Sequence, residues 1–279
     1  MTTSSSNFID ARSFIFQQFP HPLHPEEVGD SGAMELATSK TDPTEQYVIK
    51  RGNTYPEIAC NEFMYHKVAT ALGLYTQDVK LISGSKEYRR SAAIRYAPNA
   101  RIFSLKTSSE ENFRAFFQFE ALFVILNEDD SHEYYLDEQG RMFKLDNAAA
   151  FTVQQTTVLF FDGSPLGRFF IPDINAPLNA VGYDWYHLKH EQFMREHGQT
   201  AVDAYLSVIQ RFSEFDETVL YEAYDDLSKQ YPNALSQYYD RCLRIRKETC
   251  RRFLDEINGR QDCTHCPQNS RFTSLMPPP

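Results

Sequence analysis

One segment, residues 111–127, constrains the fold of this chain more than any other. Its large apolar side chains fall nearly all round a helix rather than on one face: Phe113, Phe116, Phe117, Leu122, Phe123, Ile125 and Leu126. A helix of this kind is normally buried in a core, because it has no polar face to present to water. Other elements of the chain must therefore pack round it.

Acidic residues and a histidine follow this apolar segment directly. Asp130 and His132 come within a few residues of its end, and Asp146 ends the short strand-like segment 143–146. A buried carboxylate costs several kcal/mol unless it is paired, protonated or bound to a metal. Either these residues lie in ordinary turns, or they face a functional site.

Composition narrows the class of protein. The 279 residues are enough for one large domain or two lobes, and 42% of them are hydrophobic. The net charge of −10 argues against a broad nucleic-acid surface, which needs clustered cations. We find no apolar run of the ~20 residues that a membrane span needs and no secretory signal pattern at the start. Together with five irregularly spaced cysteines, this predicts a cytoplasmic protein with reduced thiols.

The pattern along the chain predicts an α+β fold with two lobes. Short strands are expected at 46–50, 79–83 and 92–96 and helices over 201–257. Residues 152–200, with Gly and Pro spread through them, are expected to be irregular. The predicted division is an N-terminal extension (1–20), a small mixed β/α N-lobe (21–100), a mostly helical C-lobe (101–258) and a flexible tail (259–279).

A second predicted helix carries a charge on its apolar face. It begins with the capping sequence Thr54-Tyr55-Pro56-Glu57 and ends at Gly73. Glu62 lies in the middle of a stripe formed by Ile58, Tyr65, Ala69 and Leu72. A buried Glu62 needs a cation, and Lys50 at the end of a predicted strand is the nearest one that could serve. The alternative is that Glu62 lies at the solvent border and Lys50 merely ends its strand.

A glycine-containing turn lies upstream of Lys50. Gly29 and Gly32 flank Ser31 in Val28-Gly29-Asp30-Ser31-Gly32-Ala33. Such a turn can expose backbone N–H groups in a concavity that suits a phosphate. Its place shortly before a strand that ends in lysine strengthens this interpretation.

Along the chain, the glycine-containing turn, the strand lysine, the helix glutamate, the buried helix and the acidic motifs follow one another in this order. The order resembles that of the HipA-like branch of the protein-kinase-like fold, which is related to phosphatidylinositol kinases. Cys60-Asn61-Glu62 and Ala71-Leu72-Gly73-Leu74 are similar to the family's Asn-Glu helix and the turn that ends it. Asp130-Ser131-His132 resembles its Asp-x-His-x-x-Asn catalytic loop, and Lys144-Leu145-Asp146 its metal-binding aspartate. The resemblance covers roughly residues 28–255 in the order of elements.

The resemblance implies a bacterial serine/threonine kinase that uses ATP and Mg²⁺ on an unknown protein substrate. Asp130 would be the catalytic aspartate and His132 would brace its loop, while Asp146 would bind Mg²⁺. The ATP-binding residues would be Gly29, Ser31, Gly32, Lys50, Glu62 and Tyr96. Some relatives phosphorylate a serine in the glycine loop, so Ser31 is also a candidate autophosphorylation site.

One position departs from the family pattern. The expected second metal ligand is an asparagine three residues after the histidine, and this chain has Tyr135 there. Glu133 or Asn147 could substitute, Asp129 could replace Asp130 in a shifted register, or activity could be lost. The alternatives to a protein kinase are thus a pseudokinase acting as a nucleotide-binding regulatory module, and a kinase for a small-molecule or lipid hydroxyl.

Two further clusters are interpreted as structural. Cys263, His265 and Cys266 supply too few ligands for zinc and are expected in the flexible tail. The basic residues of 241–252 are expected on solvated helix faces, in ion pairs with Asp255 and Glu256.

Overall fold

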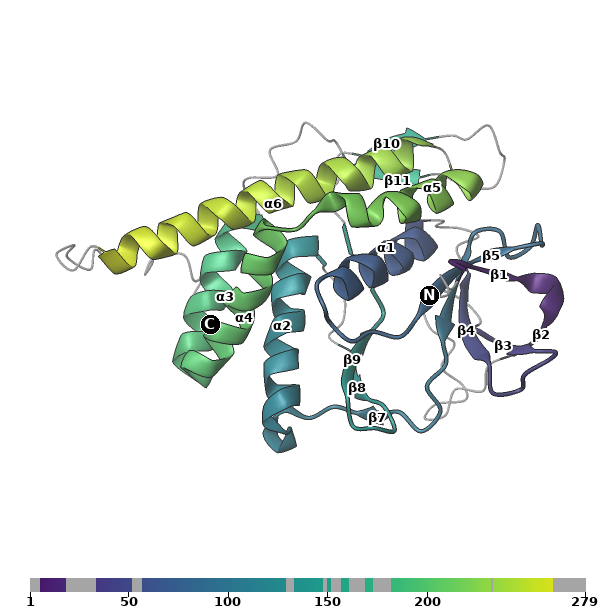
Figure 1. The fold of residues 1–279 in the computed structure, drawn as a ribbon, viewed down its shortest axis with the longest axis horizontal. Coiled ribbons are helices and arrows are strands. Elements are labelled where there is room, and N and C mark those ends of the chain that lie inside the picture. Colours follow the sequence, from purple (N-terminus) through teal and green to yellow (C-terminus); the bar gives the residue numbers. More distant parts are fainter. Residues whose placement is uncertain are drawn as a thin grey trace, which may run out of the picture.

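The computed structural model describes nine stretches of the chain: residues 6–18, 34–51, 57–128, 133–147, 150–151, 157–160, 169–172, 182–231 and 233–262. They form two lobes, with a twisted sheet and one helix on the N-terminal side and a group of helices on the other (Figure 1). The predicted two-lobed α+β architecture is confirmed. Among the described residues, no helix is long and apolar enough to cross a membrane.

A six-stranded sheet forms the N-lobe. Its strands are β1 (Phe8–Asp10), β2 (Phe14–Gln18), β3 (Glu35–Ser39), β4 (Gln46–Arg51), β5 (Val79–Ser83) and β6 (Ser91–Arg95). Their order is β1-β5-β6-β4-β3-β2, with β1 parallel to β5 and the other pairs antiparallel. A short 3-10 turn, η1 (Ala11–Ser13), joins β1 to β2.

The sheet includes residues that the sequence analysis assigns to a separate N-terminal extension. Strands β1 and β2 lie at its two edges, where they bury Ile9 and Phe14. Each strand buries few side chains, which is typical of short edge strands. Their apolar signal is therefore weak beside the Ser/Thr-rich start of the chain.

Helix α1 (Glu57–Ala71) packs on this sheet against β5 and β6. It stops where predicted, with Gly73 in the left-handed conformation at φ 74°. All described members of the predicted stripe are buried, Glu62 included. Phe63 and Met64 are also buried, because the C-lobe covers a second side of the helix. The alternative that places Glu62 at the solvent border is wrong.

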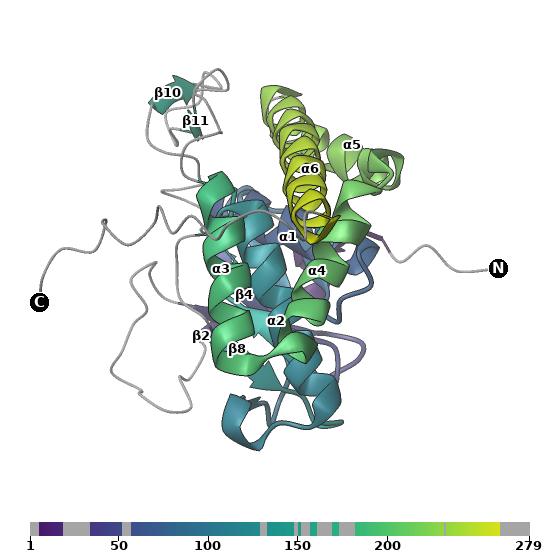
Figure 2. The same cartoon turned by 90° about the vertical axis from the view of Figure 1, so that its left-hand side faces the viewer.

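The C-lobe is built round the apolar helix, α2 (Glu110–Leu126). The other elements are β7 (Arg101–Ile102), η2 (Leu105–Thr107), β8 (Glu133–Leu136), β9 (Met142–Leu145), β10 (Thr157–Phe160), β11 (Phe169–Pro172), α3 (Gly182–His197), α4 (Gln199–Ser213), η3 (Glu217–Leu220), α5 (Tyr221–Gln230) and α6 (Asn233–Asp262). Helix α2 contacts α3, α4, α6 and β9, so its burial on several sides is confirmed. Figure 2 shows it beside α3 and α4. Ser109 caps its start and Asn127 ends it in the left-handed conformation.

Two predictions for the C-lobe are wrong. Helix α3 occupies part of the segment expected to be irregular, and it buries Tyr186 and Phe193 against its neighbours. Its apolar contacts come from a few aromatic residues in a polar helix, which gives a weak periodic signal. In the basic cluster of α6, Arg246 is only 1% exposed rather than solvated.

Candidate functional site

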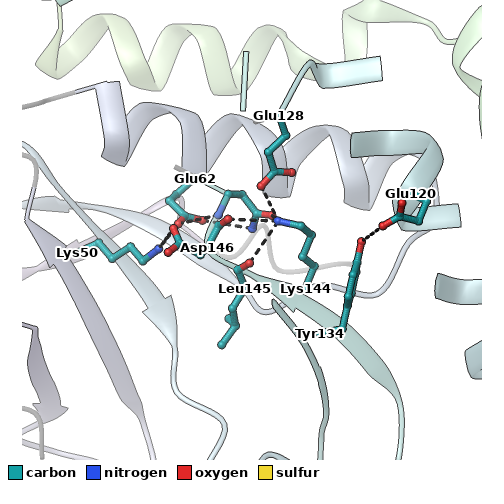
Figure 3. Close-up of polar contacts among 9 residues, drawn as sticks. Lys50, Glu62, Glu120, Glu128, Tyr134, Lys144, Leu145 and Asp146 are labelled. Atoms are coloured by element: carbon teal, nitrogen blue, oxygen red, sulfur yellow. Dashed lines mark hydrogen bonds and ion pairs between the residues drawn. The ribbon is translucent and has the colours of Figure 1, made fainter. Parts of the chain in front are cut away.

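Lys50 lies at the centre of the candidate site. It sits near the end of β4, and its Nζ donates to Glu62 Oε1 on α1 and to Asp146 Oδ1 after β9, at 2.6 Å in each case (Figure 3). The side chain of Lys50 is 13% exposed and that of Glu62 is 1% exposed. Three elements from both lobes thus supply one charged cluster. The predicted pairing of Lys50 with Glu62 is present.

Burial and charge act in opposite directions on Lys50. Burial by itself lowers the pKa of this ammonium, and the carboxylates of Glu62 and Asp146 more than reverse that effect. The net result is a pKa raised above the ordinary value for lysine. Lys50 therefore remains a cation throughout the neutral pH range.

Glu62 is held by more than its lysine. The backbone N–H of Asn147 donates to Oε1 at 3.0 Å, and the Asn147 side chain donates to Oε2 at 3.3 Å. Both oxygens of this buried carboxylate are thus satisfied, which offsets the cost of burying its charge. Asn147 follows Asp146 directly, so the same short segment holds Glu62 and presents a second carboxylate to Lys50.

Asp146 has a strained backbone and an accessible side chain. Its φ is 56°, in the left-handed region that non-glycine residues rarely adopt. Its side chain is 35% exposed, against 1% for Glu62. Of the two carboxylates on Lys50, Asp146 is the one that a ligand from solvent can reach.

A second lysine stabilises this strained segment from behind. Lys144 on β9 donates to the carbonyl of Asp146 at 3.2 Å and to Oδ1 of Asn147 at 3.1 Å. It also donates to Glu128 at 2.5 Å, in an ion pair whose two side chains are 0% exposed. Glu128 follows α2 and immediately precedes Asp129. The buried pair therefore ties the start of the predicted catalytic loop to the segment that carries Asp146 (Figure 3).

The sequence assigns no role to Lys144 beyond its place in the motif Lys144-Leu145-Asp146, and none to Glu128. The signal was nevertheless present, because Lys144 interrupts the apolar strand Met142–Leu145 just as Glu62 interrupts an apolar helical stripe. A charge at such a position predicts a buried partner.

A third buried carboxylate fixes β8. Glu120 on α2 accepts from the Tyr134 hydroxyl at 2.8 Å and from Lys189 on α3 at 2.9 Å. Glu120 and Tyr134 are both buried. The hairpin of β8 and β9 is thus anchored to the helical core through Tyr134 as well as through Lys144.

Several predicted site residues lie outside the described part of the chain. These are Gly29, Ser31 and Gly32 of the glycine-containing turn, and Asp129, Asp130 and His132 of the predicted catalytic loop. Tyr96 is described: it follows β6, where the chain leaves the N-lobe sheet, and its N–H donates to the Gln46 carbonyl at 2.9 Å. Its contact with adenine stays a prediction.

Tyr135 is part of β8, where the family pattern has its second metal ligand. It pairs with Phe143 across the hairpin, and the two rings stack with centroids 6.0 Å apart. Burial first, then Glu133 and Asp146, raise the pKa of its phenol, so it is neutral at physiological pH. Asn147 and Glu133 are the possible substitutes for the missing metal ligand. The side chain of Asn147 is already hydrogen-bonded to Glu62 and Lys144. Glu133 pairs with Leu145 in the same hairpin, and Leu145 directly precedes Asp146.

Comparisons with known proteins identify the fold. No family model matches the sequence, and a search of curated proteins gives no significant match. Among solved structures, the chain is similar to a structure described as the Helicobacter pylori proinflammatory kinase CtkA. The TM-score is 0.54 at 11% identity, covering 89% of this chain and 98% of the other. It also matches a structure described as the Shewanella oneidensis MR-1 toxin–antitoxin system HipA, HipB and operator DNA complex. There the TM-score is 0.44 at 13% identity, covering 84% of this chain and 64% of the other.

The similarity to CtkA covers most of the length of both chains, so the kinase-like fold expected from the sequence is confirmed. The HipA comparison has a lower TM-score and adds no weight to this assignment. At these identities the similarity establishes the architecture alone.

The first testable prediction concerns the buried Lys144–Glu128 pair. Lys144→Met should destabilise the protein by about 3–5 kcal/mol at neutral pH, because it leaves Glu128 as a buried charge without its cation. Urea unfolding followed by circular dichroism measures this loss. Adding Glu128→Met should recover part of it, since both charges are then removed together.

Arg195→Met is the matched control for this measurement. Arg195 pairs with Glu196 on the surface of α3, where both side chains are largely exposed. Its loss should cost less than about 1 kcal/mol. If Lys144→Met were no more destabilising than Arg195→Met, the structural role assigned to the buried pair would be wrong.

Proposed function

We propose that this protein is a phosphotransferase that uses Mg²⁺-ATP and transfers the γ-phosphate to a serine or threonine hydroxyl of a protein. The observation that carries the proposal is Lys50, placed between the buried Glu62 and the accessible Asp146. In kinases a strand lysine held by a helix glutamate contacts the nucleotide phosphates, next to an aspartate that binds the metal. The kinase-like architecture supports the same interpretation.

The donor set at Asp146 fits Mg²⁺. This cation prefers oxygen ligands, and Asp146 offers a partly exposed carboxylate with Glu133 on the adjacent strand. When bound, Mg²⁺ would neutralise charge on the transferring phosphates. Asp146 would then exchange its contact with Lys50 for the metal, and Lys50 would be free to contact phosphate while Glu62 still holds it.

The remaining roles are carried by residues predicted from the sequence. Asp130 would accept or orient the substrate hydroxyl proton, with His132 bracing its loop. The turn at Gly29–Gly32 would cover the phosphates, and phosphorylation of Ser31 there would repel ATP. Tyr96 would lie at the adenine. Support for the position of the Asp130 loop comes from Glu128, the residue before Asp129, which its buried ion pair with Lys144 holds in place.

A second candidate function is a nucleotide-binding pseudokinase. The observation in its favour is Tyr135, which has no metal-binding amide and stacks on Phe143. Such a protein would bind nucleotide and act as a regulatory or interaction module. A kinase for a small-molecule or lipid hydroxyl is a third candidate, suggested by the related phosphatidylinositol kinases.

The main test of the proposal is ATP binding by the wild type and by variants at Lys50 and Glu62. ATP with Mg²⁺ at a hundred times its dissociation constant should stabilise the protein by about 2.7 kcal/mol in thermal unfolding. Lys50→Met should weaken ATP binding by about ten- to a hundred-fold, since it removes a charged hydrogen bond to phosphate. Glu62→Gln should weaken it to a similar extent, because Lys50 would lose the group that orients it.

The double variant decides whether the two residues act together. If Glu62 works through Lys50, isothermal titration of the double variant should show much less than the sum of the two single losses. Fully additive losses would remove the kinase assignment of α1. An absence of any ATP-induced stabilisation in the wild type would reject nucleotide binding altogether.

Asp146 and Asp130 should give different phenotypes. Asp146→Asn should abolish the Mg²⁺-dependent part of ATP affinity, because it removes the charge of the metal ligand. Asp130→Asn should leave ATP affinity nearly intact and abolish phosphate transfer, measured with radiolabelled ATP. Equal losses of ATP affinity in both variants would contradict this division of roles.

Tyr135→Asn separates an impaired kinase from a pseudokinase. Restoring the family's ligand should raise the transfer rate if its absence limits the wild type. Tyr135→Phe is the control, because it keeps the stacking on Phe143 and adds no ligand. No transfer in wild type or Tyr135→Asn, alongside normal ATP binding, would favour the pseudokinase.

A further inference from the structure

The ammonium of Lys50 bridges two carboxylates that differ in exposure. Its Nζ lies 2.6 Å from Oε1 of Glu62, which is buried, and 2.6 Å from Oδ1 of Asp146, whose side chain is 35% exposed (Figure 3). Asp146 is also the side chain to which the proposed function assigns the metal. A metal that binds there must therefore compete with a cation of the protein itself.

The surrounding hydrogen bonds hold both carboxylates next to Lys50. Glu62 accepts from the backbone N–H and from the side chain of Asn147, and the carbonyl of Asp146 accepts from Lys144. Moving either acidic residue away from Lys50 would disturb these bonds as well. The bridge therefore opens at low cost only when a ligand replaces a contact that is lost.

A divalent cation alone does not replace that contact. It would take Asp146 from Lys50, leave the ammonium with the acceptor on Glu62, and place two positive charges close together. Phosphate oxygens do replace it, because they accept from Lys50 and reduce the repulsion between the ammonium and the metal. The charges thus favour metal and nucleotide together over the metal alone.

We propose that Lys50 blocks Asp146 in the free protein, so that the metal enters the site with the nucleotide phosphates and not before them. This inference rests on the proposed function for the identity of the nucleotide, and it adds an order of binding. Lys50 has two roles in this scheme. It covers the metal ligand in the free protein and contacts phosphate in the complex.

The experiment is titration of the full chain with Mn²⁺ in the absence of nucleotide, with the free ion measured by electron paramagnetic resonance. Mn²⁺ takes the same carboxylate ligands as Mg²⁺. Lys50→Met should bind Mn²⁺ at least about ten-fold more tightly than the wild type, because Asp146 loses the cation that competes for it. Adding Asp146→Asn to Lys50→Met should remove this gain. Equal Mn²⁺ affinity in wild type and Lys50→Met, or a gain that survives Asp146→Asn, would overturn the proposal.

Lys229→Met is the matched control for the removal of a lysine. Lys229 pairs with Asp226 on α5 at 2.5 Å, so this variant also frees an aspartate, but outside the candidate site. Its Mn²⁺ affinity should equal that of the wild type. A gain as large as that of Lys50→Met would show a general effect of charge and count against the block at Asp146.

Lys50→Gln keeps the test independent of folding. Its amide can still donate to the buried Glu62, although it carries no charge. Circular dichroism shows whether each variant is folded, and Lys50→Gln should also bind Mn²⁺ more tightly than the wild type. Unchanged Mn²⁺ affinity in folded Lys50→Gln would overturn the proposal even if Lys50→Met does not fold.

Thermal unfolding of the wild type with Mg²⁺-ATP separates this inference from the proposed function. Stabilisation by Mg²⁺-ATP, with unchanged Mn²⁺ affinity in Lys50→Met, would keep the proposed function and overturn the block. Tighter Mn²⁺ binding through Asp146 in Lys50→Met, with no stabilisation of the wild type by Mg²⁺-ATP, would support the block and reject the nucleotide.

Discussion

The structure depends on how the charge of one buried lysine is compensated. Lys50 lies in a sheet strand, and neither of its partners comes from that sheet: Glu62 is on α1 and Asp146 follows a C-lobe strand. An unpaired ammonium at this depth would be costly, so the folded state requires all three elements to meet. The pairing therefore joins the two lobes at the point where the proposed chemistry takes place.

A second cluster next to this one also pairs a buried lysine with a buried carboxylate. Lys144 and Glu128 are wholly buried, and Asn147 connects the two clusters by donating to Glu62 and accepting from Lys144. Networks of this kind fix geometry more strongly than isolated pairs, because moving one member leaves others unsatisfied. This arrangement explains how Asp146 can keep a left-handed backbone conformation without glycine.

The sequence predicted those features that depend on local periodicity. Helix α1 and its stop at Gly73 follow from spacing, and the apolar helix α2 follows from its run of apolar residues. Spacing also places Glu62 on the apolar stripe of α1, but only the structure decides between burial and the solvent border. Pairings across the fold could not be derived this way, because the face of a short strand that is buried depends on what packs there. The partner of Lys144 and the pairing of the edge strands belong to this group, as does the burial of Arg246 within a basic run.

The position of Glu62 depends on the C-lobe as well as on its own helix. The adjacent residue, Asn61, accepts a buried hydrogen bond of 2.6 Å from the Tyr239 hydroxyl on α6. Near the other end of α1, Lys67 donates to Asn7, which in turn donates to Asp226 on α5. A rotation of α1 away from Lys50 would break contacts at both ends and expose its second apolar side. The Lys50–Glu62 pair is therefore maintained by the same packing that joins the lobes.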